Sequence, residues 1–177
     1  MLMDPALTRV IERCREGDRD AFEEVVNRYG LQVLRTARLI VRDEAVAEDV
    51  CQETFLKAWR RIRTLRDEEP GPWLNRIATN ESISACRRRS RFQVLAERFG
   101  RFGGVKREVS TEARLDLARA LDQLAPDHRA AIVLHYYQDL SVEETASALG
   151  APVDTVKSRL KTALRRLREL TGSEEVS

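Results

Sequence analysis

Apolar residues recur at helical spacing along almost the whole chain, and this period constrains the fold more than any other feature. The spacing predicts a helix that ends near Gly17, a second that continues or kinks at Gly30, and a third that begins after Asp43. A fourth is predicted to open at Pro72, after a loop over residues 64–72 that holds two prolines. With 8 glycines and 5 prolines in 177 residues, a turn-rich β protein is disfavoured, and the expected fold class is all-α.

The helical period fails between residues 92 and 110, where three glycines stand among Arg and Phe. This break predicts two small helical domains joined by a flexible linker, although residues 94–99 leave room for one more helical turn. The expected boundaries are a first domain over 1–92, a linker over 93–111, a second domain over 112–171 and a disordered tail over 172–177.

The composition excludes several classes of protein. No apolar run approaches the roughly 20 residues that cross a bilayer, and the N-terminus lacks a signal-peptide pattern, so we expect no membrane insertion and a cytoplasmic location. Cys14, Cys51 and Cys86 form no CxxC pair, and only His128 and His135 are available as further metal ligands. We therefore expect free, buried thiols and neither a metal site nor a cofactor, while a redox role of the cysteines stays open.

Charge is separated along the chain although the net charge is only +2. Five carboxylates fall between Asp43 and Glu53, four arginines fall between Arg87 and Arg91, and six basic residues follow Thr155. Such separation indicates at least two partners of different character.

A helix-turn-helix is predicted near the C-terminus. Ser141 and Glu144 form a capping box that opens a short helix, Gly150 ends it, and a longer helix begins near Asp154. On a helical wheel, one side of the longer helix is apolar (Val156, Leu160, Ala163, Leu164, Leu167) and the opposite side is polar and basic (Ser158, Lys161, Arg165, flanked by Lys157, Thr162 and Arg168). This arrangement suits the major groove of DNA, with Arg159 nearer the side as a candidate phosphate contact; a solvated or membrane-surface helix is the alternative.

The predicted helix over residues 45–62 carries a second pattern on its outer side. An acid, an amide and an exposed leucine align opposite an apolar face that contains Cys51, Phe55, Ala58 and Trp59. The stripe consists of Asp49, Gln52, Glu53, Leu56 and Arg60. A leucine ringed by polar groups suits a docking partner helix, although an ordinary solvated face would also produce the pattern.

The following helix places an aromatic ring, hydrogen-bonding groups and cations on one strip. Its members are Trp73, Arg76, Asn80, Ser84, Arg87 and Arg91, with Arg88 in the same arginine cluster. Aromatic surfaces combined with cations hold unpaired bases, so the strip favours nucleic-acid binding. Trp73 is as well suited to plug the core as to stack on a base, and the arginines alone would fit a solvated helix end.

These segments together resemble a known family. Residues 49–59 (DVCQETFLKAW) and 73–80 (WLNRIATN) resemble region 2 of the extracytoplasmic-function (group 4) sigma factors, and residues 140–146 (LSVEETA) and 155–160 (TVKSRL) resemble their region 4. The resemblance covers approximately residues 16–92 and 112–170. It departs from the usual pattern at Ser84, where Asp is frequent, and at Thr162 and Leu164, where Arg is frequent.

The resemblance implies a transcription initiation factor that is a monomer when free. It implies that the stripe of Asp49, Gln52, Glu53, Leu56 and Arg60 binds the β′ coiled coil of RNA polymerase core, and that the second domain sits on the β flap. The strip from Trp73 to Arg91 and the loop over 65–71 would recognise and melt the −10 element. The −35 element would be read by Thr155, Lys157, Ser158, Arg159, Lys161, Thr162 and Arg165. Family members are commonly inhibited by an anti-sigma factor.

Two other classes of function are weighed against this one. A stand-alone helix-turn-helix regulator would bind duplex DNA by itself as a dimer, with half-sites about one helical turn apart. An enzyme would need a phosphate-binding glycine loop, a metal-ligand cluster or a nucleophile with its base, and the sequence displays none of these motifs. The sequence therefore predicts a sigma factor without catalytic residues.

Overall fold

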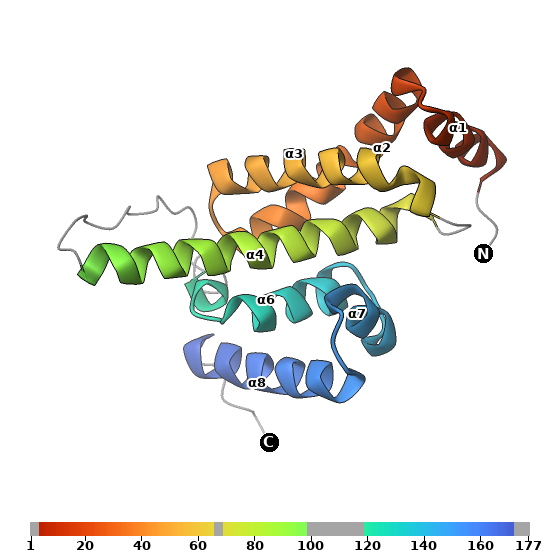
Figure 1. The fold of residues 1–177 in the computed structure, drawn as a ribbon. Coiled ribbons are helices and arrows are strands. Elements are labelled where there is room, and N and C mark those ends of the chain that lie inside the picture. The colour runs from red at the N-terminus through yellow and green to blue at the C-terminus, as the bar shows by residue number, and fades with distance from the viewer. Residues whose placement is uncertain (1–3, 66–68, 99–118, 172–177) are drawn as a thin grey trace. The chain divides into compact units, whose positions relative to one another are not determined.

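Helices form nearly all of the chain that the computed structural model describes, which comprises residues 4–65, 69–98 and 119–171 (Figure 1). Contacts divide the protein into two units, Met1–Ser82 and Ile83–Ser177, and each is described here by itself. The described residues contain no β-strand, as the helical period predicts. None of the described helices is long and apolar enough to cross a membrane.

Helix ends in the first unit follow short polar caps. Helix α1 (Pro5–Glu16) ends at Gly17, whose φ of 96° is left-handed. Asp18 accepts hydrogen bonds from the amides of the first turn of α2 (Arg19–Val41), and Asp43 accepts one from Val46 at the start of α3 (Glu44–Arg61). Helix α2 runs without a break through Gly30, so the alternative of a kink there is excluded.

The segment after α3 departs from the prediction. A 3-10 turn, η1, covers Ile62–Thr64, and α4 (Pro70–Arg98) begins two residues before the predicted start at Pro72. Both Pro70 and Pro72 lie within the first turn of α4, where a missing backbone N–H breaks no helical hydrogen bond. Residues 66–68 of the predicted loop lie outside the described residues.

Helix α4 also continues further than the sequence predicts. Residues 93–98, placed in the expected linker, belong to α4, and no glycine or proline interrupts this stretch before Gly100. The rest of the expected linker, residues 99–111, lies outside the described part of the chain, as do the predicted core residues Leu115 and Ala118 and the expected tail.

The core of the first unit gathers side chains from all four helices and η1. Leu7 and Ile11 of α1, Val25 of α2, Ala58 of α3 and Leu74 of α4 are almost fully buried in one cluster. The same cluster contains Tyr29, Val33, Phe55, Ile62, Leu65, Trp73 and Ala78. Figure 1 shows α2, α3 and the beginning of α4 running side by side around it.

Hydrogen bonds from arginine side chains to backbone carbonyls tie α1 to the segment after α3. Arg15 donates to the carbonyl of Leu65, and Arg63 donates to the carbonyl of Arg15 at 3.2 Å. Because these two bonds join positions about fifty residues apart, they hold the end of η1 against α1.

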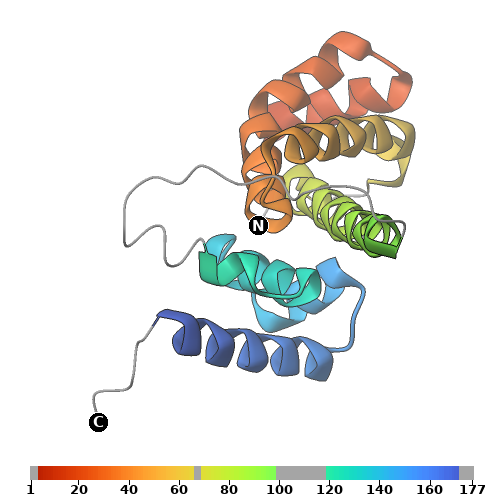
Figure 2. The ribbon, with the colours of Figure 1, turned by 90° about the vertical axis from the view of Figure 1, so that its left-hand side faces the viewer.

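The second unit contains a helix-turn-helix. Residues 119–122 are helical, and α6 (Pro126–Ile132) continues into a π-helical turn, η2 (Val133–Tyr137), whose last turn closes with Gln138 donating to Val133 at 3.0 Å. Helix α7 (Val142–Leu149) leads to α8 (Val153–Thr171), which lies alongside α6 in Figure 2. Val156 and Leu160 of α8 pack with Ala131 and Ala146 in one core cluster.

The predicted capping box is confirmed in this unit. The Glu144 amide donates to Ser141 Oγ at 3.1 Å, and the Ser141 amide donates to the Glu144 carboxylate at 2.8 Å. These hydrogen bonds lower the pKa of Glu144, with the bond from the backbone of Ser141 as the largest cause. Gly150 ends α7 with a left-handed φ of 58°, which glycine adopts without strain.

Candidate interfaces for a protein partner and nucleic acid

The outer stripe of α3 is exposed as the sequence predicts. Asp49, Gln52 and Arg60 are exposed, and the Leu56 side chain is 51% accessible, which is high for a large apolar residue. Glu53 is half-buried and pairs with Lys57 one turn later, at 3.5 Å between Nζ and Oε1. The α3 stripe thus combines carboxylates with an unpacked leucine.

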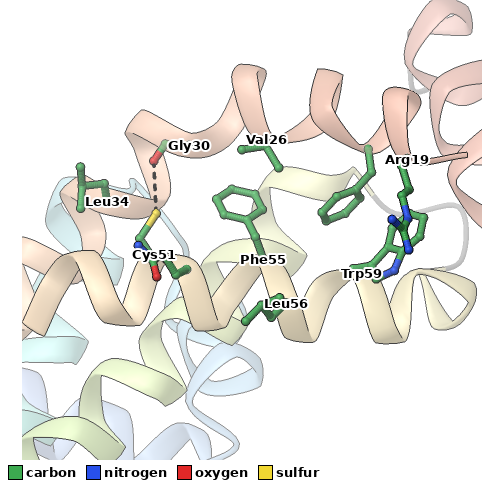
Figure 3. A pocket seen from close by; sticks show the side chains of 10 residues that line it. Arg19, Val26, Gly30, Leu34, Cys51, Phe55, Leu56 and Trp59 are labelled. Atoms are coloured by element: carbon green, nitrogen blue, oxygen red, sulfur yellow. Dashed lines mark hydrogen bonds between the residues drawn. The ribbon is translucent and has the colours of Figure 1, made fainter.

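An apolar groove lies between α2 and α3 beside this stripe, and we call it the α2–α3 groove (Figure 3). It has a volume of about 740 Å³, and Figure 3 shows Val26 of α2 facing Phe55 of α3 across it. Its walls are formed by Arg19, Phe22, Val26, Gly30, Leu34, Cys51, Gln52, Phe55, Leu56 and Trp59. Large open apolar surfaces of this kind mark binding sites for other molecules, since leaving them in water is costly.

Aromatic rings build one end of the groove and a glycine opens the other. The ring of Phe22 lies 5.0 Å from that of Trp59 and 6.4 Å from that of Phe55, edge to face in the second case. At Gly30 an added Cβ would meet nothing within 4 Å, so the missing side chain leaves open space. Two predicted core residues of α3, Cys51 and Trp59, are therefore only half-buried and line this groove.

The three cysteines are free, but only Cys14 is buried as predicted. Burial raises the pKa of the Cys14 thiol to about 11. Burial also raises the pKa of Cys51, against the opposing charge of Arg38, and its sulfur lies 3.9 Å from the carbonyl oxygen of Gly30. Both thiols are therefore protonated and weakly reactive at neutral pH.

The strip predicted on α4 is exposed or half-buried, except at its first member, Trp73, which is buried. Asn80, Arg87, Arg88 and Arg91 are exposed, and Arg76 and Ser84 are half-buried. Trp73 is only 6% accessible and belongs to the core of the first unit, which favours the alternative that its ring plugs the core over stacking on a base.

A second cavity, the α3–α4 pocket, lies where this strip faces α3. It has a volume of about 290 Å³ and is lined by Lys57, Arg61, Thr64, Trp73, Arg76, Ile77, Asn80 and Glu81. Lys57 Nζ of α3 lies 2.7 Å from Glu81 Oε1 of α4, which joins the two helices across the pocket. The sequence patterns did not single out four of these residues as site residues: Lys57, Arg61, Thr64 and Glu81. The first three nevertheless follow an i, i+4, i+7 spacing that places them on one face.

The outer face of α8 keeps its basic residues in solvent. Lys157, Ser158, Lys161 and Arg165 are exposed, whereas Thr155 and Thr162 are half-buried. On the opposite face Val156, Leu160 and Ala163 are buried as predicted.

Arg159 differs from the other cations of α8. Its side chain is only 24% accessible, and Nη2 lies 3.3 Å from Asp127 Oδ1 of α6. This ion pair lies within the second unit and occupies part of the guanidinium, so Arg159 is less available for the predicted phosphate contact than the exposed cations of α8.

No group of three His, Cys, Asp or Glu side chains in the described part of the chain is arranged to hold a metal ion. The candidate surfaces are therefore an apolar groove, a polar pocket and a basic helix face.

Two family models match the chain. Residues 25–92 match sigma-70 region 2, and residues 114–167 match sigma-70 region 4. The RNA polymerase sigma factor CarQ of Myxococcus xanthus is 34% identical over 173 residues, which cover 94% of this chain and 98% of that protein. The chain belongs to the extracytoplasmic-function group of the sigma-70 family.

Further relatives are also RNA polymerase sigma factors, and one of them carries the group name. The ECF RNA polymerase sigma factor SigE of Mycolicibacterium smegmatis is 34% identical over 84% of this chain, which spans 61% of that protein's length. The sigma-E factor of Streptomyces coelicolor is 35% identical over 84% of each chain. Members of the sigma-70 family are specificity factors for transcription initiation, and this sigma factor has the same role.

Two solved structures share the fold of this sigma factor. The sigma factor RpoE of Bartonella quintana, in complex with the anti-sigma factor NepR, is 26% identical with a TM-score of 0.69 and covers 87% of this chain and 98% of its own. CnrH, in complex with the cytosolic domain of CnrY, is 27% identical with a TM-score of 0.66 and covers 94% of this chain and 97% of its own. The region 2 match includes α3 and the α3–α4 pocket, and the region 4 match includes α6 and α7.

Proposed function

We propose that this sigma factor binds RNA polymerase core through its first unit and recognises the −10 and −35 promoter elements with α4 and α8. The observation that carries the proposal is the juxtaposition, in one small unit, of the exposed apolar α2–α3 groove and the cationic α3–α4 pocket on either side of α3. The first surface fits a protein helix and the second fits nucleic acid, so α3 is placed between two partners.

The groove and the α3 stripe are assigned to the β′ coiled coil of core polymerase. Gln52 and Leu56 belong to both surfaces, so a helix lying in the groove would contact the stripe at once. Burial of the groove supplies affinity at roughly 25 cal/mol per Å² of apolar surface. Asp49 and Glu53 at its edge favour a partner with basic residues and disfavour an acidic one.

The α3–α4 pocket and the exposed strip of α4 are assigned to the −10 element. Taking a base out of the stack costs a few kcal/mol, and stacking on an aromatic ring would return roughly 1–3 kcal/mol per base. Because Trp73 is buried, hydrogen bonds to Asn80 and Thr64 must supply the free energy that offsets unstacking. The cations Lys57, Arg61 and Arg76 would add to it. The proposed −10 residues are Arg76, Asn80, Ser84, Arg87, Arg88 and Arg91, with Trp73 as their structural support.

The exposed face of α8 is assigned to the −35 element as duplex. Ser158 lies in the N-terminal half of α8, which meets base edges when such a helix enters the major groove, and Lys161 after it is assigned to a phosphate. Arg165 lies one turn further on and is assigned to a phosphate. The proposed −35 residues are Thr155, Lys157, Ser158, Lys161, Thr162 and Arg165, without Arg159.

Further parts of the proposal rest on the family. We assign the second unit to the β flap, and we assign the domain limits as 1–92 and 112–171. RpoE of Bartonella quintana forms a complex with the anti-sigma factor NepR, and CnrH forms one with the cytosolic domain of CnrY, which supports an anti-sigma factor as a partner of this chain. We also propose that the free protein is a monomer, acts in the cytoplasm and contributes no catalytic residue, since the polymerase forms the bonds.

The experiment that tests this function measures binding of one fluorescent promoter duplex with and without purified core polymerase. A sigma factor binds the promoter strongly only when core is present, and the complex is lost when unlabelled promoter competes but not when random duplex does. A stand-alone regulator would bind the duplex by itself as a dimer. Strong specific binding without core would therefore overturn the proposal in favour of a regulator.

A further inference from the structure

The α3–α4 pocket contains one acidic side chain among its cations. Glu81 is only 15% accessible, whereas its partner Lys57 is 32% accessible, so the carboxylate is the more enclosed of the two. Arg61 and Arg76 also line this pocket. A carboxylate in a surface for nucleic acid is unfavourable toward phosphates, so its position needs an explanation from the ligand.

The ion pair with Lys57 does not by itself explain why an acidic residue stands in this pocket. Lys57 already has a carboxylate partner on its own helix, Glu53, at 3.5 Å and i,i+4 spacing. A carboxylate also offers about four acceptor positions, and the 2.7 Å contact with the ammonium of Lys57 is made by Oε1 of Glu81. One ammonium cannot occupy all of these positions, so Glu81 retains acceptor capacity toward a ligand in the pocket.

We propose that Glu81 selects the base that enters the α3–α4 pocket, by accepting a hydrogen bond from an exocyclic amino group. Adenine, cytosine and guanine carry such a group, whereas thymine has carbonyl oxygens on either side of one ring N–H, so a thymine with its O4 at the amino position would set a carbonyl oxygen against the carboxylate. The pocket volume of about 290 Å³ lies at the lower end of the range for small ligands and suits one base. This inference rests on the proposed −10 function of the pocket.

The low solvent accessibility of Glu81 strengthens its discrimination between bases. A site built to hydrogen-bond an amino group rejects an analogue without it, because the acceptor is then left unpaired away from water. Lys57 holds the Glu81 carboxylate in one place, so it cannot easily turn away from an unsuitable base. One good contact to a base edge discriminates by about tenfold or more, which sets the size of the effect to be measured.

The test uses holoenzyme reconstituted from core polymerase and the full chain, with promoters in which each −10 position of the non-template strand carries each of the four bases in turn. The wild type is expected to disfavour thymine by about tenfold or more at one position. Glu81→Gln is expected to reduce that preference to within about threefold, because the new amide can donate to thymine, and to leave the other positions unchanged. Glu81→Asp, which keeps the charge, should retain the direction of the preference.

Glu24→Gln is the matched control, since it also converts a carboxylate to an amide and removes an ion pair of the first unit, with Arg13 at 3.2 Å. It should leave every base preference unchanged. A second measurement keeps the protein intact and replaces adenine by purine, or cytosine by 2-pyrimidinone, which deletes only the amino group. The same position should lose about tenfold in initiation with wild type and much less with Glu81→Gln.

The two proposals fail in different ways. Initiation by Glu81→Gln with the wild-type preference at every position overturns the role of Glu81 and leaves the proposed function standing. An equal response of the wild type to each base and its analogue without the amino group, adenine and purine as well as cytosine and 2-pyrimidinone, at all −10 positions does the same, even if the variant is poorly folded. Absence of specific initiation by the wild-type holoenzyme removes the proposed function, and the role of Glu81 with it.

Discussion

The two units of this sigma factor present their candidate surfaces in different ways. In the second unit a single helix, α8, supplies the whole proposed DNA surface, with buried Val156 and Leu160 on one face and exposed Lys161 and Arg165 on the other. In the first unit the groove and the pocket each lie between two helices, α2 with α3 and α3 with α4. A surface on one helix follows from the period of the sequence, whereas a surface between helices depends on how they pack.

This difference has energetic consequences. Side chains on the outer face of α8 contribute little to the core, so changing them should alter binding and leave stability nearly unchanged. The groove and the pocket share residues with the core of the first unit, as Trp73 and Phe55 illustrate. Removing these shared side chains should alter both binding and stability. Only selected substitutions in the groove and the pocket separate the two effects.

The largest effect is expected at Trp73. Trp73→Ala should lower the free energy of unfolding by about 3–5 kcal/mol, because it leaves a cavity in the core. Trp73→Phe should retain promoter melting, measured by 2-aminopurine fluorescence at the −10 element, since the ring is assigned a structural role. A Trp73→Phe protein with wild-type unfolding but no melting would restore the stacking hypothesis.

The second largest effect is expected from charge reversal on the α3 stripe. Asp49→Arg together with Glu53→Arg should weaken binding to core polymerase by at least about 30-fold, as expected when like charges replace complementary ones at an interface. The control is Glu12→Arg with Glu16→Arg, an equally spaced pair of exposed carboxylates on α1, outside the region 2 match. Co-purification of the α3 variant with core at the wild-type yield would remove the stripe from the interface.

A substitution at Gly30 should separate binding from folding in the α2–α3 groove. Gly30→Ala should stabilise α2 by about 1 kcal/mol, since the added Cβ meets nothing within 4 Å and Ala is the better helix former. Gly30→Leu should keep part of that gain and fill the groove, which lowers affinity for core by about tenfold, or about 1.4 kcal/mol. Thermal unfolding and a core-binding titration measure the two effects, and unchanged affinity of the Leu variant would show that nothing binds there.

The smallest effect is expected on α8 and compares two of its cations. Lys161→Ala should reduce the slope of log affinity against log salt for the −35 element by about 0.9, as for one lost phosphate contact. Arg159→Ala should leave this slope unchanged, because its guanidinium pairs with Asp127. The pattern is contradicted if Arg159→Ala changes the slope and Lys161→Ala does not.

Local signals in the sequence predicted most of the helices. Ser141 with Glu144 predicted the capping box, and Gly17 and Gly150 predicted helix ends, because each signal acts over one turn. The start of α4 was placed at Pro72 and lies at Pro70, since both prolines suit a first turn and the sequence does not distinguish them. The length of α4 was also underestimated, as weak periodicity over residues 93–98 concealed a helix.

The candidate sites were predictable only where one helix carries them. The α3 stripe and the α8 face follow from helical wheels of residues 45–62 and 154–168. The role of Trp73 could not be decided, because a wheel does not say which side of an aromatic ring its neighbours cover. Glu81 and Lys57 were missed for the same reason, since their 2.7 Å contact joins helices that are distant in sequence.

In vitro transcription on a promoter library tests the central claim most directly. Purified core polymerase should produce specific transcripts only when this chain is added, and the active promoters should share two short elements, at −10 and −35. Random or absent initiation, with core in its active form confirmed by another sigma factor, would contradict the assignment of this chain as a promoter-specific initiation factor.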